Sequence, residues 1–554
     1  MSEDSSEVTI DIDVPKVQPE VNGDSELRRR KDSTDKQSKR SSNTSRKKRA
    51  FINIAPLNTP LSHRLETLGV IWHFVSIPFF ICLFLFTISL GLFGWVMIIL
   101  PYFIWLYGFD LHTPTNGKVV YRVRNSMKNF IIWDWFVRYF PIKVYKTVDL
   151  EPTFSEVLVE ETESSDDDEQ DLVSEHSRTL VDKLFKKLGL QKRLNDVSSA
   201  KSGKIKEIST GPRYIFGYHP HGVISMGAVG LFATNALRNE PYTPFSKWLK
   251  PFFHDSSKGE RLFPGLGTIF PLTLTTQFVV PFYRDYLMGL GITSASAKNI
   301  RSLINNGDNS VCLVVGGAQE SLLNNMVAKH ARVGYGYKEN KDIHGSDVED
   351  EEDEVVKSTT TNTIENHKTK REVQLVLNKR KGFVKLAIEL GNVALVPIFA
   401  FGEADVYRLA NPAPGSFLYK FQRWMKSTFQ FTIPLFSARG VFIYDFGLLP
   451  FRNPINICVG RPVYIPAGAL QEYKAEHPEE FADDKEKPIK KSGSFTDIFK
   501  SNGDKKPKSS SIKTKIPQAL LDKYHKLYVD ELKRVYEENK NKFGYDDVEL
   551  NIVE

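Results

Sequence analysis

The chain has 554 residues, and 74 Lys and Arg against 67 Asp and Glu give it a net charge of +7. With 41 % hydrophobic residues, 25 % charged residues and a mean hydropathy of −0.30, its averages match a soluble multidomain protein. They exclude a polytopic transporter, a fibrous chain and a wholly disordered one. Three cysteines exclude a disulfide framework, and we expect Cys82, Cys312 and Cys458 to be buried thiols in a reducing compartment.

The averages conceal a membrane segment behind a polar tail. Residues 1–60 are rich in Ser, Asp and Lys, which predicts a disordered tail without a cleavable signal peptide. From Thr67 to Phe109, 43 positions contain no Asp, Glu, Lys or Arg. As a helix this run would be about 65 Å long, roughly two crossings of a ~30 Å hydrocarbon layer. A bend at Ser89–Gly94 therefore predicts a membrane hairpin over 67–109, with a single crossing and a re-entrant segment left open.

The charges beside the hairpin predict its orientation. Eleven basic residues lie between Arg28 and Arg49, and Lys118, Arg122, Arg124 and Lys128 follow the apolar run. Basic flanks stay on the cytosolic side of a membrane. Both flanks, and with them the domain predicted over 118–545, are therefore expected to face the cytosol.

The rest of the chain predicts one α/β domain interrupted by polar insertions. Tracts at about 155–205, 338–372 and 483–515 are too polar to bury a core, so we predict that they are disordered. Apolar runs between them predict strands, and a 3.6-residue periodicity predicts helices. The expected strands are 213–218, 311–315, 393–399 and 455–459, and the expected helices are 381–390 and 516–542. Their alternation indicates a largely parallel sheet. The aromatic segment 125–140 fits either the membrane interface or a packed helix.

One segment carries an obvious chemistry. Tyr218-His219-Pro220-His221-Gly222 directly follows a predicted strand, and a histidine there suits a general base. Histidines that only bond the turn backbone are the alternative. A zinc site would need further ligands, for which only His254 and His330 are available, so we predict no metal. Ser225 lacks the Gly-x-Ser-x-Gly setting of a nucleophilic serine, and the scattered basic and aromatic residues do not indicate nucleic-acid binding.

Motifs in a fixed order then identify a family. They are Tyr139-Phe140-Pro141, YHPHG at 218–222, Phe232-Ala233-Thr234, Phe263-Pro264-Gly265, PFYRD at 281–285, GGAQES at 316–321 and RKGFVKLAIELGNVALVPIFAFGE at 380–403. The chain resembles the type-2 diacylglycerol acyltransferase family in these motifs, over most of residues 65–545. The resemblance implies a glycerolipid-acyltransferase-like sheet, mixed or parallel and flanked by helices.

It also implies an activity. Acyl-CoA, as co-substrate and without a further cofactor, would acylate diacylglycerol to give triacylglycerol and CoA at the endoplasmic reticulum membrane and the lipid droplet surface. Acylation of monoacylglycerol, a sterol or a fatty alcohol is an alternative, and so is a non-catalytic lipid-droplet scaffold. Diacylglycerol, acyl-CoA and membrane lipid are the expected partners, and a homo-oligomer is left open.

Site residues follow from the resemblance. HPHG is similar to a His-x4-Asp box, but Ile224 and Met226 stand where the aspartate would be. We therefore expect His219 as base, His221 as its helper and Glu320 as the orienting carboxylate. The remaining candidates are substrate-binding: Glu403 as a second carboxylate, Arg284, Arg380 and Lys381 for CoA phosphates, Gly316 and Gly317 for close approach of the backbone, and the motif residues Tyr139, Phe140, Pro141, Pro220 and Gly222.

Overall fold

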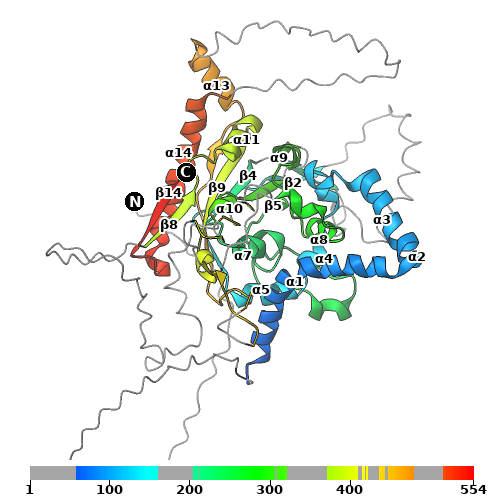
Figure 1. Ribbon diagram of the computed structural model, residues 1–554. Coiled ribbons are helices and arrows are strands. Elements are labelled where there is room, and N and C mark those ends of the chain that lie inside the picture. The colour runs from blue at the N-terminus through cyan, green and yellow to red at the C-terminus, as the bar shows by residue number, and fades with distance from the viewer. Residues whose placement is uncertain are drawn as a thin grey trace, which may run out of the picture.

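The fold is organised around one eight-stranded sheet (Figure 1). The computed structural model describes residues 56, 58–159, 204–209, 211–305, 309–320, 371–409, 415–417, 420–421, 424, 436–442, 447–479 and 516–553. Along the sheet the strands are β1 (Lys143–Lys146), β12 (Asn456–Val459), β9 (Val393–Phe401), β4 (Arg213–His219), β7 (Ser310–Val314), β5 (Ile269–Thr273) and β6 (Thr293–Ser294), and β13 (Val463–Ile465) also pairs with β9. The strands from β9 to β6 are parallel, whereas β12 and β13 run antiparallel to β9. The prediction of an α/β fold with a mostly parallel sheet is therefore confirmed.

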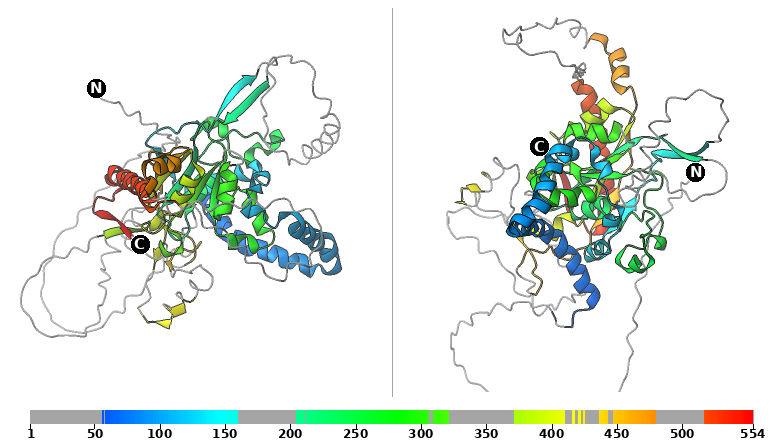
Figure 2. Two further views of the ribbon diagram at one scale, coloured as in Figure 1. Left: turned by 90° about the horizontal axis from the view of Figure 1, so that it is seen from above. Right: turned by 90° about the vertical axis from the view of Figure 1, so that its right-hand side faces the viewer.

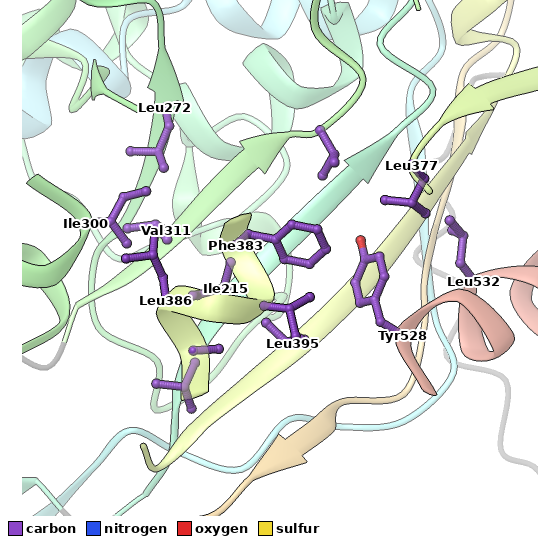
Figure 3. Close-up of a cluster of buried hydrophobic side chains, with 14 of the residues drawn as sticks. Ile215, Leu272, Ile300, Val311, Leu377, Phe383, Leu386, Leu395, Tyr528 and Leu532 are labelled. Carbon is purple, nitrogen blue, oxygen red and sulfur yellow. The ribbon is translucent and has the colours of Figure 1, made fainter. Parts of the chain in front are cut away.

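Strands β4 and β9 at the centre of the sheet are buried along almost their whole length, because helices cover both faces. Along β4, Ile215 joins one hydrophobic core, while Phe216 joins the other. Parallel strands that are buried on both sides need such continuous apolar runs. The first core contains α8 (Tyr283–Gly289), α9 (Ala297–Asn305), α11 (Gly382–Leu390) and α14 (Gln518–Asn539), and Figure 3 shows part of it. The second contains α5 (Ile132–Tyr139) and α7 (Met226–Ala228), which continues through a π-helical turn at Val229–Ala233.

The helices and strands predicted from periodicity lie within a few residues of their expected positions. Helix α11 ends at Gly391, which has φ +63°, a conformation that glycine adopts without strain. Helix α14 falls inside the predicted 516–542. The aromatic segment 125–140 forms α4 (Asn125–Lys128) and α5, and α5 packs against α1 with Phe136 and Tyr139 fully buried. Of the two alternatives for this segment, the structure therefore has the packed helix.

The apolar run forms a helical hairpin that projects from the domain (Figures 1 and 2). Its first arm is α1 (Leu61–Ser89), and the second runs over Gly91–Thr115 through α2 (Gly91–Gly94), α3 (Leu100–Trp105) and π-helical turns. The chain bends at Gly91, which has φ +62°. Each arm is long and apolar enough to cross a membrane. Cys82 lies exposed on α1, so the expectation that all three cysteines are buried is wrong for this one.

Three small strand pairs complete the fold. Strand β2 (Phe154–Val159) pairs with β3 (Lys204–Ser209) in the ribbon seen in Figure 2, β8 (Arg371–Val376) pairs with β14 (Val548–Val553), and β10 (Arg408–Leu409) pairs with β11 (Phe436–Ser437). The predicted insertion 155–205 therefore begins within β2 and ends within β3, and the last two residues of 338–372 lie in β8. The rest of these tracts, residues 483–515 and residues 1–55 lie outside the described residues. The remaining α-helices among the described residues are α10 (Gly317–Glu320) and α13 (Ala469–Glu476).

Candidate active site

His219 is the last residue of β4 and is fully buried. Its Nε2 lies 2.9 Å from the hydroxyl of Tyr528 on α14, and its Nδ1 has no hydrogen-bond partner among the described residues. Tyr528 also donates to the carbonyl of Gly217 at 3.3 Å. Burial lowers the pKa of His219 to about 3, because desolvation disfavours the charged imidazolium. The ring is therefore neutral at physiological pH.

His221 lies in the turn beyond β4 and is partly exposed. Its Nδ1 lies 3.0 Å from the carbonyl of Gly222, which fixes a ring with the proton on Nδ1 and the lone pair on Nε2. Desolvation lowers the pKa of His221 below its ordinary value. The turn thus presents a neutral, partly exposed imidazole whose Nε2 accepts no hydrogen bond from another described residue.

Glu320 holds this turn through its backbone. One carboxylate oxygen accepts the N–H of His221 at 2.6 Å, and the other accepts the N–H of Val376 in β8 at 2.9 Å. Burial raises the pKa of Glu320 to about 7, although the two N–H groups and nearby Arg380 favour the charged form. Glu320 therefore lies at the predicted site, but it contacts the backbone of the histidine turn rather than an imidazole ring.

The two glycines before Glu320 have different functions. A Cβ on Gly316 would lie 2.1 Å from the Glu320 carboxylate, so only glycine lets that side chain fold back to the turn. Gly317 has φ +62°, and a Cβ there would meet no atom within 4 Å. The sequence predicts that the backbone at this pair allows a close approach. At Gly316 the group that approaches the backbone is the carboxylate of Glu320.

Glu403 supports the helix behind the histidine turn. Its carboxylate accepts the N–H groups of Met226 and Gly227 at 2.6 and 2.9 Å and the hydroxyl of Tyr218 at 2.7 Å. Anions are favourable at such a helix N-terminus. Burial raises the pKa of Glu403 to about 7. A Cβ on Gly222 would lie 3.1 Å from the Glu403 carbonyl, so this glycine, with φ +56°, packs directly on Glu403.

The three predicted cations lie in different environments. Arg380 is exposed and close enough to Glu320 to affect its charge. Lys381 is paired with Asp522 of α14 at 2.6 Å. Arg284 is buried and donates to the carbonyl and carboxylate of Asp110 at 2.7 and 3.0 Å. Of these three predicted cations, Arg380 is therefore the one that lies exposed beside the histidine turn.

A family model described as "Diacylglycerol acyltransferase" matches residues 88–161, 170–334 and 352–478. These segments cover well over half of the chain and include the histidine turn, Glu320 and Glu403. The chain belongs to the diacylglycerol acyltransferase family. Membership confirms the predicted enzyme, which synthesises triacylglycerol from acyl-CoA, over a non-catalytic scaffold.

Proteins that are named as acyltransferases are similar to this chain over most of its length. "Diacylglycerol O-acyltransferase 1" of Saccharomyces cerevisiae is 38 % identical over 90 % of this chain and 88 % of its own length. "Diacylglycerol O-acyltransferase 2A" of Umbelopsis ramanniana is 32 % identical over 74 % of this chain and 81 % of its own length. "2-acylglycerol O-acyltransferase 1" of Bos taurus is 28 % identical over 89 % of this chain and 96 % of its own length. The comparison with solved structures finds no match.

The Tyr139-Phe140-Pro141 motif of this diacylglycerol acyltransferase lies in the core. Tyr139 and Phe140 are fully buried, and the Tyr139 hydroxyl donates to the carbonyl of Pro450 at 2.7 Å. The guanidinium of Arg452 lies 4.5 Å from the centre of the Tyr139 ring. These contacts give the motif a structural role at the end of α5. Pro220 is also buried and forms the turn between the two histidines.

Tyr528 is the site residue that the sequence did not reveal. It is 309 positions from His219, and Figure 3 shows it extending from α14 beside Phe383, with its hydroxyl pointing away from the helix. A signal was nevertheless present in β4. Gly217 interrupts a run of bulky residues, and a Cβ there would lie 1.9 Å from the Tyr528 hydroxyl. An isolated glycine in a strand often marks such a close approach.

Proposed function

We propose that the chain is a type-2 diacylglycerol acyltransferase in which His221 is the general base. The observation that carries this assignment is the histidine turn itself: His221 is partly exposed, and its Nδ1 is bonded to Gly222. This geometry favours His221 over His219, which is buried and bonded to Tyr528. His219 then becomes a positioning residue for the turn.

The proposed reaction is a direct transfer. His221 Nε2 accepts the proton of the diacylglycerol hydroxyl while that oxygen attacks the thioester carbonyl of acyl-CoA. The tetrahedral intermediate collapses with cleavage of the C–S bond. The leaving CoA thiolate takes the proton back from the imidazolium, so His221 is regenerated and triacylglycerol is released. No acyl-enzyme forms.

Glu320 and Arg380 assist from either side of the turn. Glu320 fixes the His221 backbone, and a base that is held in place reacts faster than one that must be oriented. Arg380 is an exposed cation beside it and suits the phosphates of CoA. The proposal includes no metal, and the described residues contain no group of three or more His, Cys, Asp or Glu side chains placed to bind one.

The helical hairpin accounts for how the catalytic domain is held at the membrane. Diacylglycerol and triacylglycerol are dissolved in the membrane, so a cytosolic domain must be held against it. Two apolar arms and the basic residues on both sides of them support an anchor with both flanks in the cytosol. We therefore propose the endoplasmic reticulum membrane and the lipid droplet surface as its sites of action.

The acceptor alcohol is tested with purified full-length protein and labelled oleoyl-CoA. Diacylglycerol, 2-monoacylglycerol, a sterol and a fatty alcohol are offered separately. We expect the fastest transfer to diacylglycerol. Slower transfer to 2-monoacylglycerol would agree with the Bos taurus relative, whose name gives that acceptor. Equal or faster transfer to sterol or fatty alcohol would contradict the assignment.

A further inference from the structure

A cavity lies where the hairpin meets the domain, away from the histidine turn. It has a volume of about 560 Å³ and is lined by Phe80 of α1, Tyr102 and Trp105 of α3, and Phe282 and Tyr286 at α8, among others. An adjoining cavity of about 440 Å³ shares Met127 and Tyr286 with it. We call the larger cavity the hairpin groove. Its aromatic walls suit hydrocarbon rather than water.

The PFYRD motif builds one wall of the hairpin groove. Phe282 has φ +61°, a strained conformation for a residue with a bulky side chain. Its N–H donates to the Tyr102 hydroxyl at 3.1 Å, and the two rings lie 4.9 Å apart. Asp285, in the same motif, accepts the Tyr102 hydroxyl at 2.8 Å. Backbone strain held in place by such contacts is often found at binding sites.

The charges around the hairpin groove are unbalanced. Arg122 is paired with Asp110 at 2.5 Å and Asp285 at 2.6 Å, so both carboxylates are occupied. Arg124 lines the same groove but donates only to backbone carbonyls of Tyr121 and Val123, at 3.2 and 3.1 Å, among the described residues. Burial and the neighbouring charge of Arg122 lower the pKa of Arg124. An arriving anion would favour the charged guanidinium and so oppose both effects.

We propose that the hairpin groove binds one anionic phospholipid of the cytosolic leaflet, with its phosphate on Arg124 and an acyl chain against Phe80 and Trp105. Charge complementarity favours this occupant. A lipid without phosphate would leave Arg124 without a counter-charge, and in a zwitterionic phospholipid the attached cation offsets the charge of the phosphate. Position favours it too, because the groove lies at the root of an apolar hairpin beside a basic flank. The lipid would join the hairpin to the domain, a function separate from acyl transfer.

Native mass spectrometry of the full-length protein in mild detergent tests the proposal. The protein is titrated with phosphatidylserine, with phosphatidylcholine of the same chains, and with inorganic phosphate. We expect one tightly bound phosphatidylserine and binding of phosphatidylcholine that is weaker by about fivefold or more, because its choline cation offsets the charge of the phosphate and repels Arg124. Arg124→Ala should weaken phosphatidylserine binding by about tenfold or more, the effect of losing a charge-assisted hydrogen bond. Arg138→Ala, which removes an exposed arginine on α5, should leave it unchanged.

Three results would overturn the proposal: equal binding by wild type and Arg124→Ala, equal affinity for the two lipids, or displacement of lipid by inorganic phosphate alone. If Arg124→Ala unfolds, Arg124→Lys retains the charge and should retain binding within about threefold. A second readout needs no change at Arg124. Brominated phosphatidylserine should quench tryptophan fluorescence more than brominated phosphatidylcholine, and Trp105→Phe should abolish the difference. Persistence of that difference in Trp105→Phe would place the lipid elsewhere.

Discussion

The histidine turn and the root of the hairpin use polar residues in opposite ways. At the root, Arg284 is paired with Asp110, and Arg122 is paired with Asp110 and Asp285. At the turn, His221 uses one ring nitrogen on Gly222 and leaves the other free among the described residues, while Glu320 holds its backbone. A buried cation that is paired with carboxylates stabilises structure, whereas a partly exposed imidazole with an unused lone pair can react. The difference separates two motifs that look equally catalytic in the sequence.

Removing Arg284 should have the largest effect on stability. Arg284→Ala leaves the buried Asp110 with Arg122 as its remaining cationic partner, so the cost should approach but not exceed the roughly 3–5 kcal/mol of a fully broken buried pair. We expect a large fall in thermal stability in detergent, with KM for acyl-CoA unchanged in the folded fraction. Arg301→Ala, which breaks an exposed pair with Glu389, is the control and should cost about 0–1 kcal/mol. A raised KM with normal stability would instead make Arg284 a phosphate ligand.

Changing Glu320 should reduce the rate rather than the affinity. In Glu320→Gln the amide cannot accept both the His221 and the Val376 N–H groups, so the turn loses one charge-assisted bond worth about 1.5–3 kcal/mol. We expect kcat to fall about tenfold or more, with KM for acyl-CoA changed less than threefold. Steady-state kinetics distinguish the two parameters. An unchanged kcat would mean that Glu320 does not position the base.

Arg380 and Lys381 provide a smaller, matched comparison. Arg380→Ala removes an exposed cation beside the turn, and we expect KM for acyl-CoA to rise several-fold, about the effect of one exposed charge–phosphate contact. Lys381 is already paired with Asp522, so Lys381→Ala should change KM less. Measuring both variants at low and at high salt checks that the effect is electrostatic. A larger rise in KM for Lys381→Ala than for Arg380→Ala would instead assign the phosphate contact to Lys381.

Glu320 should also contribute a modest pH dependence. Its pKa is raised from 4.5 to about 7 in the folded protein, so the folded state binds more protons than the unfolded state between those values. The contribution of this group to stability is therefore present at low pH and is lost as pH rises through about 7. The melting temperature of the wild type should fall more between pH 5 and pH 8 than that of Glu320→Gln. The same fall in melting temperature for both proteins would contradict the raised pKa of Glu320.

Much of the sheet could be predicted from sequence, because strands buried on both faces need continuous apolar runs. Strands β4, β7 and β9 satisfy that rule and lie close to their expected positions. Helix α11 was predictable from its 3.6-residue periodicity. Pairings between distant segments could not be predicted. Strand β8 pairs with β14, which lies 177 residues later, and hydrophobic periodicity carries no information about which strand a segment joins.

Side-chain roles were predictable only in part. The histidine turn could be proposed from its place after a predicted strand, whereas Glu320 was implied by the family resemblance. The structure brings them together because β4 and β7 are parallel and end at one edge of the sheet. The structural role of Arg284 could not be predicted, because its partner Asp110 lies 174 positions earlier. The sequence does not indicate which acidic residue a given arginine will pair with. Tyr528 was missed because a tyrosine in an amphipathic helix resembles any other core residue.

The central claim is that His221 removes the proton of the diacylglycerol hydroxyl. Its most direct test is the kcat of purified His221→Ala with labelled oleoyl-CoA and diacylglycerol, measured beside its melting temperature. We predict a fall of about 10²-fold or more, the contribution of a general base, with an unchanged melting temperature. A rate near that of the wild type would contradict the assignment.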